Sequence, residues 1–342
     1  MTRVCREPKM TRSRPIAVVA VIFSLFIAAI PARPLAAASS RAELKRLRIS
    51  LPGIGSASYP LIMAQKMGYF RAEGYDVELI PMSGGLAVKT HLAGEVDFTS
   101  AGTVVAAIRG AKLKTLMAFI RELPYDLMAA PEIKRVEDLR GSKVAVSDRG
   151  SVTYIVARAI LQGHGLEPDK DVNILNMGRP DVRYQGLMAG VVQAVIANFD
   201  GAAFLRTRGY HSVAKAAKYT KGFAGSLSAT ADQMQRKPDE ALRVIRATLK
   251  GTRAYLALPD EAVRITSAWS RVTPDIAAKV HELMSAGPLA PDGLLDHATM
   301  EVVIADAQAL SNTKRPVRLD EIYDFSLVQR VNEELNNNRW RP

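Results

Sequence analysis

The fold is decided by residues 47–81, which read LRISLPGIGSASYPLIMAQKMGYFRAEGYDVELIP. Residues 47–51 and 75–81 alternate apolar and polar side chains, which is the two-residue period of a strand. Between them, residues 59–70 carry apolar side chains at helical spacing, and Gly68 is expected to stop this helix. A strand, a helix and a second strand in this order predict a parallel βαβ unit.

The alternation of predicted strands and helices continues to residue 120 and restarts after Pro131. The two halves share an internal echo, because LAGEVDF at residues 92–98 and AGVVQA at residues 189–194 each end a helix at Ala-Gly and enter a strand. Two similar lobes explain this echo. The region after Pro238 is predicted to be largely helical. We expect strands at residues 47–51, 75–81, 96–99, 113–120, 143–146, 171–176 and 191–197, and helices at residues 59–70, 87–93, 103–109, 136–141, 153–164, 181–189, 239–256, 260–270, 274–285, 299–311 and 324–336.

The N-terminus has the three parts of a secretory signal peptide. Basic residues precede an apolar run at residues 16–30, which is too short to cross a bilayer comfortably. Pro31 and three alanines at residues 36–38 follow, so we expect residues 1–38 to be cleaved off as a signal peptide. The alternative is a retained membrane anchor. Cleavage would remove Cys5, the only cysteine, so the exported protein would contain no disulfide.

The charge of the chain does not indicate a nucleic-acid partner. The formal net charge is +12, of which residues 1–38 carry a net +5, so about +7 remains on the rest. This charge is scattered among acidic residues, and the sequence has no nucleic-acid-binding motif, so we expect no nucleic-acid partner. The remaining length of about 300 residues exceeds the usual size of a single core and favours two lobes.

Five segments resemble one family of receptors. The stretch AQKMGYFRAEGYDVEL at residues 64–79 resembles the signature A-x-x-x-G-Y/F-F-x-x-x-G-L-D-V-E of the SsuA/TauA-type solute-binding proteins of ABC transporters. Residues 92–98, 136–146, 150–153 and 165–172 resemble further segments of that family, in the same order. Its members serve the uptake of sulfonates, nitrate, taurine and thiamine-pyrimidine precursors.

The resemblance implies an α/β fold of the periplasmic-binding-protein type II. Two βαβ lobes would be joined by a two-strand hinge, with the ligand cleft between them. Residues 39–130 and 225–342 would form lobe 1, including the C-terminal helices, and residues 131–224 would form lobe 2. The function implied is that of a monomer in the periplasm, which captures a small polar molecule, anionic or aromatic, for an ABC permease in the inner membrane.

The loops after the strands are the candidate binding site, because ligands of parallel α/β sheets bind beyond the carboxyl ends of the strands. Small residues let a ligand approach the backbone, and hydroxyl and free N–H groups at helix N-termini suit a polar or anionic acceptor. The alternative is that these residues are helix caps and turn residues. The candidates are Ser56, Ala57 and Tyr59 after the first strand, Ser83 and Gly84 after the second, Ser100, Ala101, Gly102 and Thr103 after the third, and Gly150, Ser151 and Thr153 at a helix start in lobe 2.

Four further residues complete the predicted site. Arg121 and Arg179 follow strands, and either could bind a carboxylate, sulfonate or phosphate through its planar fork. The alternative for both is a solvated surface arginine. Asn198 and Asp200 end the last strand of lobe 2 and are expected to face the cleft. Tyr59 could stack on a flat ligand or pack in the first helical turn.

The sequence contains no catalytic motif that we recognise. Its histidines are dispersed, and there is no G-x-S-x-G elbow, Walker loop or G-x-G-x-x-G after a strand. We therefore expect a receptor with no cofactor and no metal. Two alternatives stay open: a sensor that presents its ligand to a membrane partner, and an enzyme of thiamine-pyrimidine biosynthesis on the same fold. Such an enzyme carries a cysteine-rich iron motif, which this chain lacks.

Overall fold

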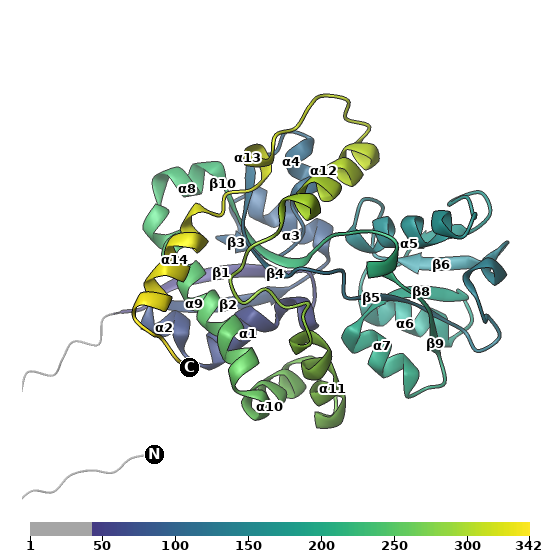
Figure 1. Ribbon diagram of the computed structural model, residues 1–342, viewed down its shortest axis with the longest axis horizontal. Coiled ribbons are helices and arrows are strands. Elements are labelled where there is room, and N and C mark those ends of the chain that lie inside the picture. The colour runs from purple at the N-terminus through teal and green to yellow at the C-terminus, as the bar shows by residue number, and fades with distance from the viewer. Residues whose placement is uncertain (1–42) are drawn as a thin grey trace, which may run out of the picture. The chain divides into compact units, whose positions relative to one another are not determined.

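The computed structural model describes residues 43–342, so the predicted signal peptide, residues 1–38, lies outside the described part. Two mixed five-stranded sheets form the framework, with helices packed against each (Figure 1). The first sheet has the order β2-β1-β3-β10-β4 and the second the order β7-β6-β8-β5-β9. The predicted α/β class is confirmed.

In the first sheet, four strands run in the same direction and one strand from late in the chain runs antiparallel to them. β1 (Lys45–Leu51) pairs in parallel with β2 (Tyr75–Pro81) and β3 (Phe98–Thr99). β10 (Ala224–Thr230) lies antiparallel between β3 and β4 (Leu113–Ile120). We call this sheet and the helices packed on it the first lobe.

The helices of the first lobe come from both ends of the described chain. The long helix α9 (Pro238–Ala257) packs against α1 (Tyr59–Lys66), and α14 (Ser326–Asn337) packs against α9 and β4. Apolar side chains from β1, α1 and α9 share one core, which includes Leu47, Tyr59 and Ile245. The helices are η1 (Ser56–Ser58), α1 (Tyr59–Lys66), α2 (Tyr69–Ala72), α3 (Gly84–Leu92), α4 (Val104–Ile108), α8 (Ala231–Arg236), α9 (Pro238–Ala257), α10 (Pro259–Ser270), α11 (Pro274–Ser285), α12 (His297–Ser311), α13 (Leu319–Ile322) and α14 (Ser326–Asn337).

The second sheet, with its helices, forms the second lobe. β6 (Lys143–Val146) pairs in parallel with β7 (Asn173–Asn176) and β8 (Ala194–Asn198). β5 (Tyr125–Ala129) lies antiparallel between β8 and β9 (His211–Lys215). Its helices are η2 (Val136–Leu139), α5 (Val152–Gly163), α6 (Pro180–Met188), α7 (Phe199–Arg206) and η3 (Ala216–Lys218).

The chain passes between the two sheets twice. It leaves the first sheet after β4 and joins the second sheet at β5, which begins at Tyr125. It returns after η3 and enters the first sheet again at Ala224, the first residue of β10. β5, β9, β10 and α7 were not expected from the sequence.

The internal echo falls at equivalent places in the two lobes. Gly94 after α3 and Gly190 after α6 both have positive φ, of 76° and 70°. Each glycine ends a helix and leads into the third parallel strand of its sheet, β3 or β8. Glycine adopts this left-handed conformation without the steric cost of a Cβ atom.

Candidate functional site

The loops after the parallel strands of the two lobes touch one another. A Cβ atom placed on Gly55 would lie 2.5 Å from Asn198 Nδ2, and one on Gly85 would lie 4.0 Å from Asp148 Oδ2. A Cβ atom on Gly102 would lie 4.0 Å from a methyl carbon of Val152. We call this contact region the interlobe boundary. The candidate loops from the two lobes therefore converge there.

Asp200 connects the lobes at this boundary. It lies in the first turn of α7, and its carboxylate accepts hydrogen bonds from the backbone N–H of Ser56, at 2.8 Å, and from the hydroxyl of Tyr59. Tyr59 is fully buried, and its hydroxyl also lies 2.9 Å from Ser270 Oγ. Burial, and to a lesser extent the negative charge of Asp200, raise the pKa of Tyr59 well above its usual value. Tyr59 thus stays neutral and joins the two lobes through its hydroxyl.

Asn198 caps α7 on the same side. Its Oδ1 accepts hydrogen bonds from the backbone N–H of Gly201, at 3.0 Å, and from the hydroxyl of Tyr184, at 3.1 Å. A side chain on Gly201 would collide with the Tyr184 phenol. The capping role fixes the orientation of Asn198 where it meets Gly55 of the first lobe.

Several candidate hydroxyls have structural partners. Ser151 caps α5 by accepting from the backbone N–H of Tyr154 at 3.3 Å, and Thr153 Oγ1 accepts from the backbone N–H of Ser147 at 2.9 Å. The hydroxyl of Thr103 lies 3.1 Å from that of Ser228 on β10. The hydroxyls of these three residues therefore already have hydrogen-bond partners within the described chain.

The remaining loop candidates contribute backbone. Ala57 O approaches Gly225 so closely that a side chain at position 225 would collide with it. Ala101 is buried, and its N–H donates to Thr99 Oγ1 at 3.2 Å. Ser83 precedes α3 without a side-chain cap, Gly84 begins that helix, Gly102 is exposed, and Gly150 has a φ of 88° in the turn before α5.

Three serine hydroxyls at the same edge are buried without a partner. Ser56 Oγ, Ser100 Oγ and Ser226 Oγ make no hydrogen bond with any described residue, although each serine is at most 1% exposed. Ser56 follows β1 and Ser100 follows β3, while Ser226 lies near the start of the antiparallel β10, so all three are at one edge of the first sheet. A buried hydroxyl without a partner is costly, so each such group in a native structure needs an explanation, for example a water or a ligand that completes its hydrogen bonds. Ser226 was missed by the sequence prediction because β10 was missed.

The two arginines singled out in the sequence already have carboxylate partners. Arg121 forms an ion pair with Asp292, in a loop of the first lobe. Arg179 is exposed and pairs with Asp181 at 3.0 Å. A third arginine, Arg183 on α6, is only 4% exposed, and its Nε atom has no hydrogen-bond partner in the described chain. Nothing in the sequence distinguished it from the surface arginines.

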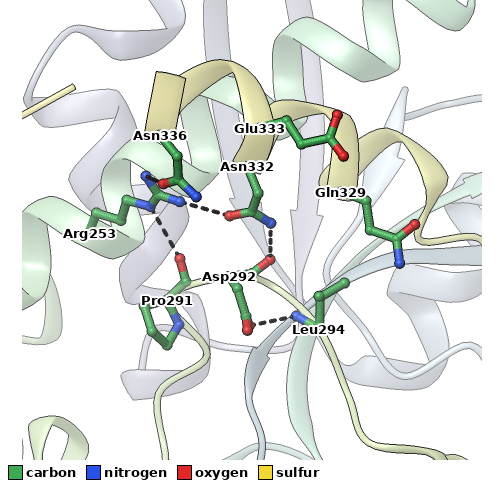
Figure 2. A pocket seen from close by; sticks show the side chains of 8 residues that line it. All are labelled: Arg253, Pro291, Asp292, Leu294, Gln329, Asn332, Glu333 and Asn336. Carbon is green, nitrogen blue, oxygen red and sulfur yellow. Dashed lines mark hydrogen bonds between the residues drawn. The ribbon is translucent and has the colours of Figure 1, made fainter. Parts of the chain in front are cut away.

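A groove of about 530 Å³ lies elsewhere on the first lobe. Figure 2 shows Arg253 donating to Pro291 O and to Asn332 Oδ1, while Asn332 donates to Asp292 O. These polar groups satisfy one another and tie α14 to the loop before α12. None of the candidate site residues lines this groove, so we assign it a structural role.

The described residues offer little for other chemistry. Within residues 43–342, no cluster of three or more histidine, cysteine, aspartate or glutamate side chains could hold a metal ion. Over the same range, the helices are too short or too polar to span a bilayer. His164 lies between Glu137 and Tyr219, at 2.8 and 2.7 Å, where it ties η2 to the segment after η3, away from the interlobe boundary.

Comparison with solved structures shows the fold. A protein from Bordetella bronchiseptica RB50 superposes with a TM-score of 0.74 at 22% identity, over 86% of this chain and 99% of that one. The periplasmic aliphatic sulphonate binding protein SsuA from Escherichia coli superposes with a TM-score of 0.65 at 15% identity, over 81% and 91% of the two chains. The desulfurization enzyme DSZB shares the fold as well, with a TM-score of 0.61 at 16% identity over 85% and 99%.

Sequence comparison shows the family. The riboflavin-binding protein RibY of Chloroflexus aurantiacus is 25% identical over 250 residues, which cover 68% of this chain and 69% of RibY. The family described as NMT1/THI5 like matches residues 56–262, more than half of the chain. As the predicted kinship with SsuA-type receptors implied, the chain belongs to the NMT1/THI5-like family, on the fold of the periplasmic solute-binding proteins.

Proposed function

We propose that this chain is a periplasmic receptor that captures a small polar organic solute at the interlobe boundary and delivers it to an ABC permease. The observation that supports this most is a set of buried hydroxyls, those of Ser56, Ser100 and Ser226, which have no hydrogen-bond partner in the described part of the chain and lie at the edge where the lobes meet. A solute with several acceptor atoms would complete their hydrogen bonds. Membership of the NMT1/THI5-like family and the fold support this role. Because the enzyme DSZB has the same fold, the fold alone does not decide between binding and catalysis, and solute binding is the property to test.

The test is a ligand screen by thermal unfolding of the chain without residues 1–38. The panel contains alkanesulfonates, taurine, nitrate, aromatic acids, pyrimidines and riboflavin, the last because of the similarity to RibY. A ligand at 100 times its Kd stabilises the folded state by about 2.7 kcal/mol, which raises Tm by several degrees. A folded protein that no compound stabilises would contradict the proposal for these ligand classes.

Two variants locate the binding site. Ser100→Ala removes a hydroxyl without a partner and is expected to weaken binding about fivefold to tenfold. Ser326→Ala, at the start of the distant helix α14, is the matched control and should leave affinity unchanged. Equal affinities for both variants would place the ligand away from Ser100.

A further inference from the structure

Arg183 is a buried cation with no counter-ion among residues 43–342. It lies at the end of the first turn of α6 and is 4% exposed. A guanidinium has five N–H donors, yet the described chain supplies one hydrogen bond, from Nη1 to the carbonyl of Gly178. Nε is buried without a partner, and no carboxylate of residues 43–342 forms a salt bridge with Arg183.

Such an arrangement is costly for the protein alone. A buried charge without a partner destabilises a fold, and proteins normally supply a counter-charge. Two carboxylates in this part of the lobe are already engaged: Asp181 pairs with Arg179, and Asp200 accepts from Ser56 and Tyr59. The positive charge of Arg183 therefore remains available to an anion from outside the chain.

Its position is beside the interlobe boundary. The bond to Gly178 brings the guanidinium to the loop after β7, at the carboxyl edge of the second sheet. The adjacent Tyr184 bonds to Asn198, which faces Gly55 of the first lobe. Arg183 also lies near Tyr125, which is the strand partner of Asn198. Burial raises the pKa of Tyr125, and the positive charge of Arg183 opposes that rise.

We propose that Arg183 binds the anionic group of the captured solute, a carboxylate or a sulfonate, and thereby makes the receptor selective for organic anions. Because Nη1 is held by Gly178, the free edge of the guanidinium is the one formed by Nε and Nη2. This edge presents two parallel N–H donors, which match two oxygens of a carboxylate or sulfonate. The inference rests on the proposed receptor function, since it names the chemical class of that ligand.

The experiment compares anions with uncharged isosteres. Titration calorimetry of the chain without residues 1–38 measures benzoate against benzamide, benzenesulfonate against benzenesulfonamide, and butanesulfonate against butanesulfonamide. The wild-type chain should bind at least one anion and prefer it to its amide. Arg183→Gln should weaken the binding of that anion on the order of 30-fold or more. Arg183→Lys keeps the positive charge and loses the planar pair of N–H donors, so its affinity for the anion should lie between that of the wild type and that of Arg183→Gln.

A control and a second readout separate binding from folding. Arg208→Gln replaces an exposed arginine of the same lobe and should bind the anion as the wild type does. Without ligand, Arg183→Gln should unfold at the wild-type Tm or above it, because it removes an unpaired buried charge. Equal binding of anions and amides, unchanged in Arg183→Gln, would overturn the assignment of Arg183 while the receptor function stands. Failure of every solute of the full panel to bind the wild type would overturn both.

Discussion

At the scale of single residues, Asp200 takes the place that the sequence suggested for a ligand. The Ser56 N–H group begins a helical segment and was expected to bind an anion, yet the carboxylate of Asp200 accepts it at 2.8 Å. An anionic solute would have to displace Asp200 from this donor. The unpaired groups of Ser100, Ser226 and Arg183 carry no such competitor among the described residues.

His91 offers a prediction on pH. It is 2% exposed in α3, with Nδ1 at 3.3 Å from Val96 O, and Nε2 has no hydrogen-bond partner within residues 43–342. Burial lowers its pKa from 6.5, against the opposing effect of the Val96 carbonyl. The unfolded chain takes up a proton at His91 below pH 6.5 and the folded chain does so only at lower pH. This contribution to stability is therefore complete above pH 6.5 and is lost as the pH falls.

The measurement is the free energy of unfolding in urea at about pH 7.5 and about pH 5.5. His91→Gln should lose less stability between these pH values than the wild type, because it removes the titrating group. His297→Gln is the control, since the side chain of His297 is 69% exposed. If His91→Gln loses as much stability as the wild type between these two pH values, the prediction is wrong.

The residues of the candidate site could be predicted only in part. Ser56 and Ser100 follow recognisable strands, so their place at a sheet edge could be read from the sequence. Arg183 stands among Pro, Asp, Tyr and Gln, a composition typical of an exposed helix. Its burial depends on how α6 packs against the rest of the lobe, which no local pattern encodes.

At the scale of elements, local patterning decided which strands could be recognised. β2, β4 and β6 have the predicted bounds because their side chains alternate or form apolar runs. β10 reads AGSLSAT, with small side chains typical of a loop, and its strand conformation comes from pairing with β3 and β4. Such long-range pairing overrides weak local propensity.

The close packing of α1 against α9 leads to a prediction about stability. Gly251 in α9 faces α1 so closely that a Cβ atom would lie 2.7 Å from Ala64 N and would collide with Pro60 O. Gly251→Ala should lower stability by about 1–3 kcal/mol through overpacking, although alanine favours helix by about 1 kcal/mol. Gly84→Ala, at the start of α3, is the control, because its nearest neighbour would be Pro52 at 4.0 Å. Equal Tm values for the two variants would show that the helices can move apart without cost.

At the scale of the whole molecule, Gly55 controls how closely the lobes approach. A Cβ atom there would lie 2.5 Å from Asn198 Nδ2 and 3.0 Å from Asp200 Oδ2. Asn198 cannot swing away without giving up the cap of α7. Gly55→Ala should therefore separate the lobes and weaken ligand binding.

Spin labels can measure this separation. Cys5 is the only cysteine and is absent when residues 1–38 are removed, so Lys89→Cys and Lys170→Cys place one label on each lobe. The distance between the labels should lengthen in Gly55→Ala and stay unchanged in the control Gly84→Ala. A distance distribution identical to the wild type in Gly55→Ala would contradict the prediction.

The late position of β10 in the chain has a consequence for folding order. All strands of the second sheet lie between Tyr125 and Lys215, so that sheet can form as soon as this continuous segment is available. The first sheet cannot, because β10 fills the place between β3 and β4 and begins only at Ala224. We therefore expect a nascent chain to complete its second lobe first. Until β10 has been synthesised, β4 has an unpaired edge that can pair with other chains.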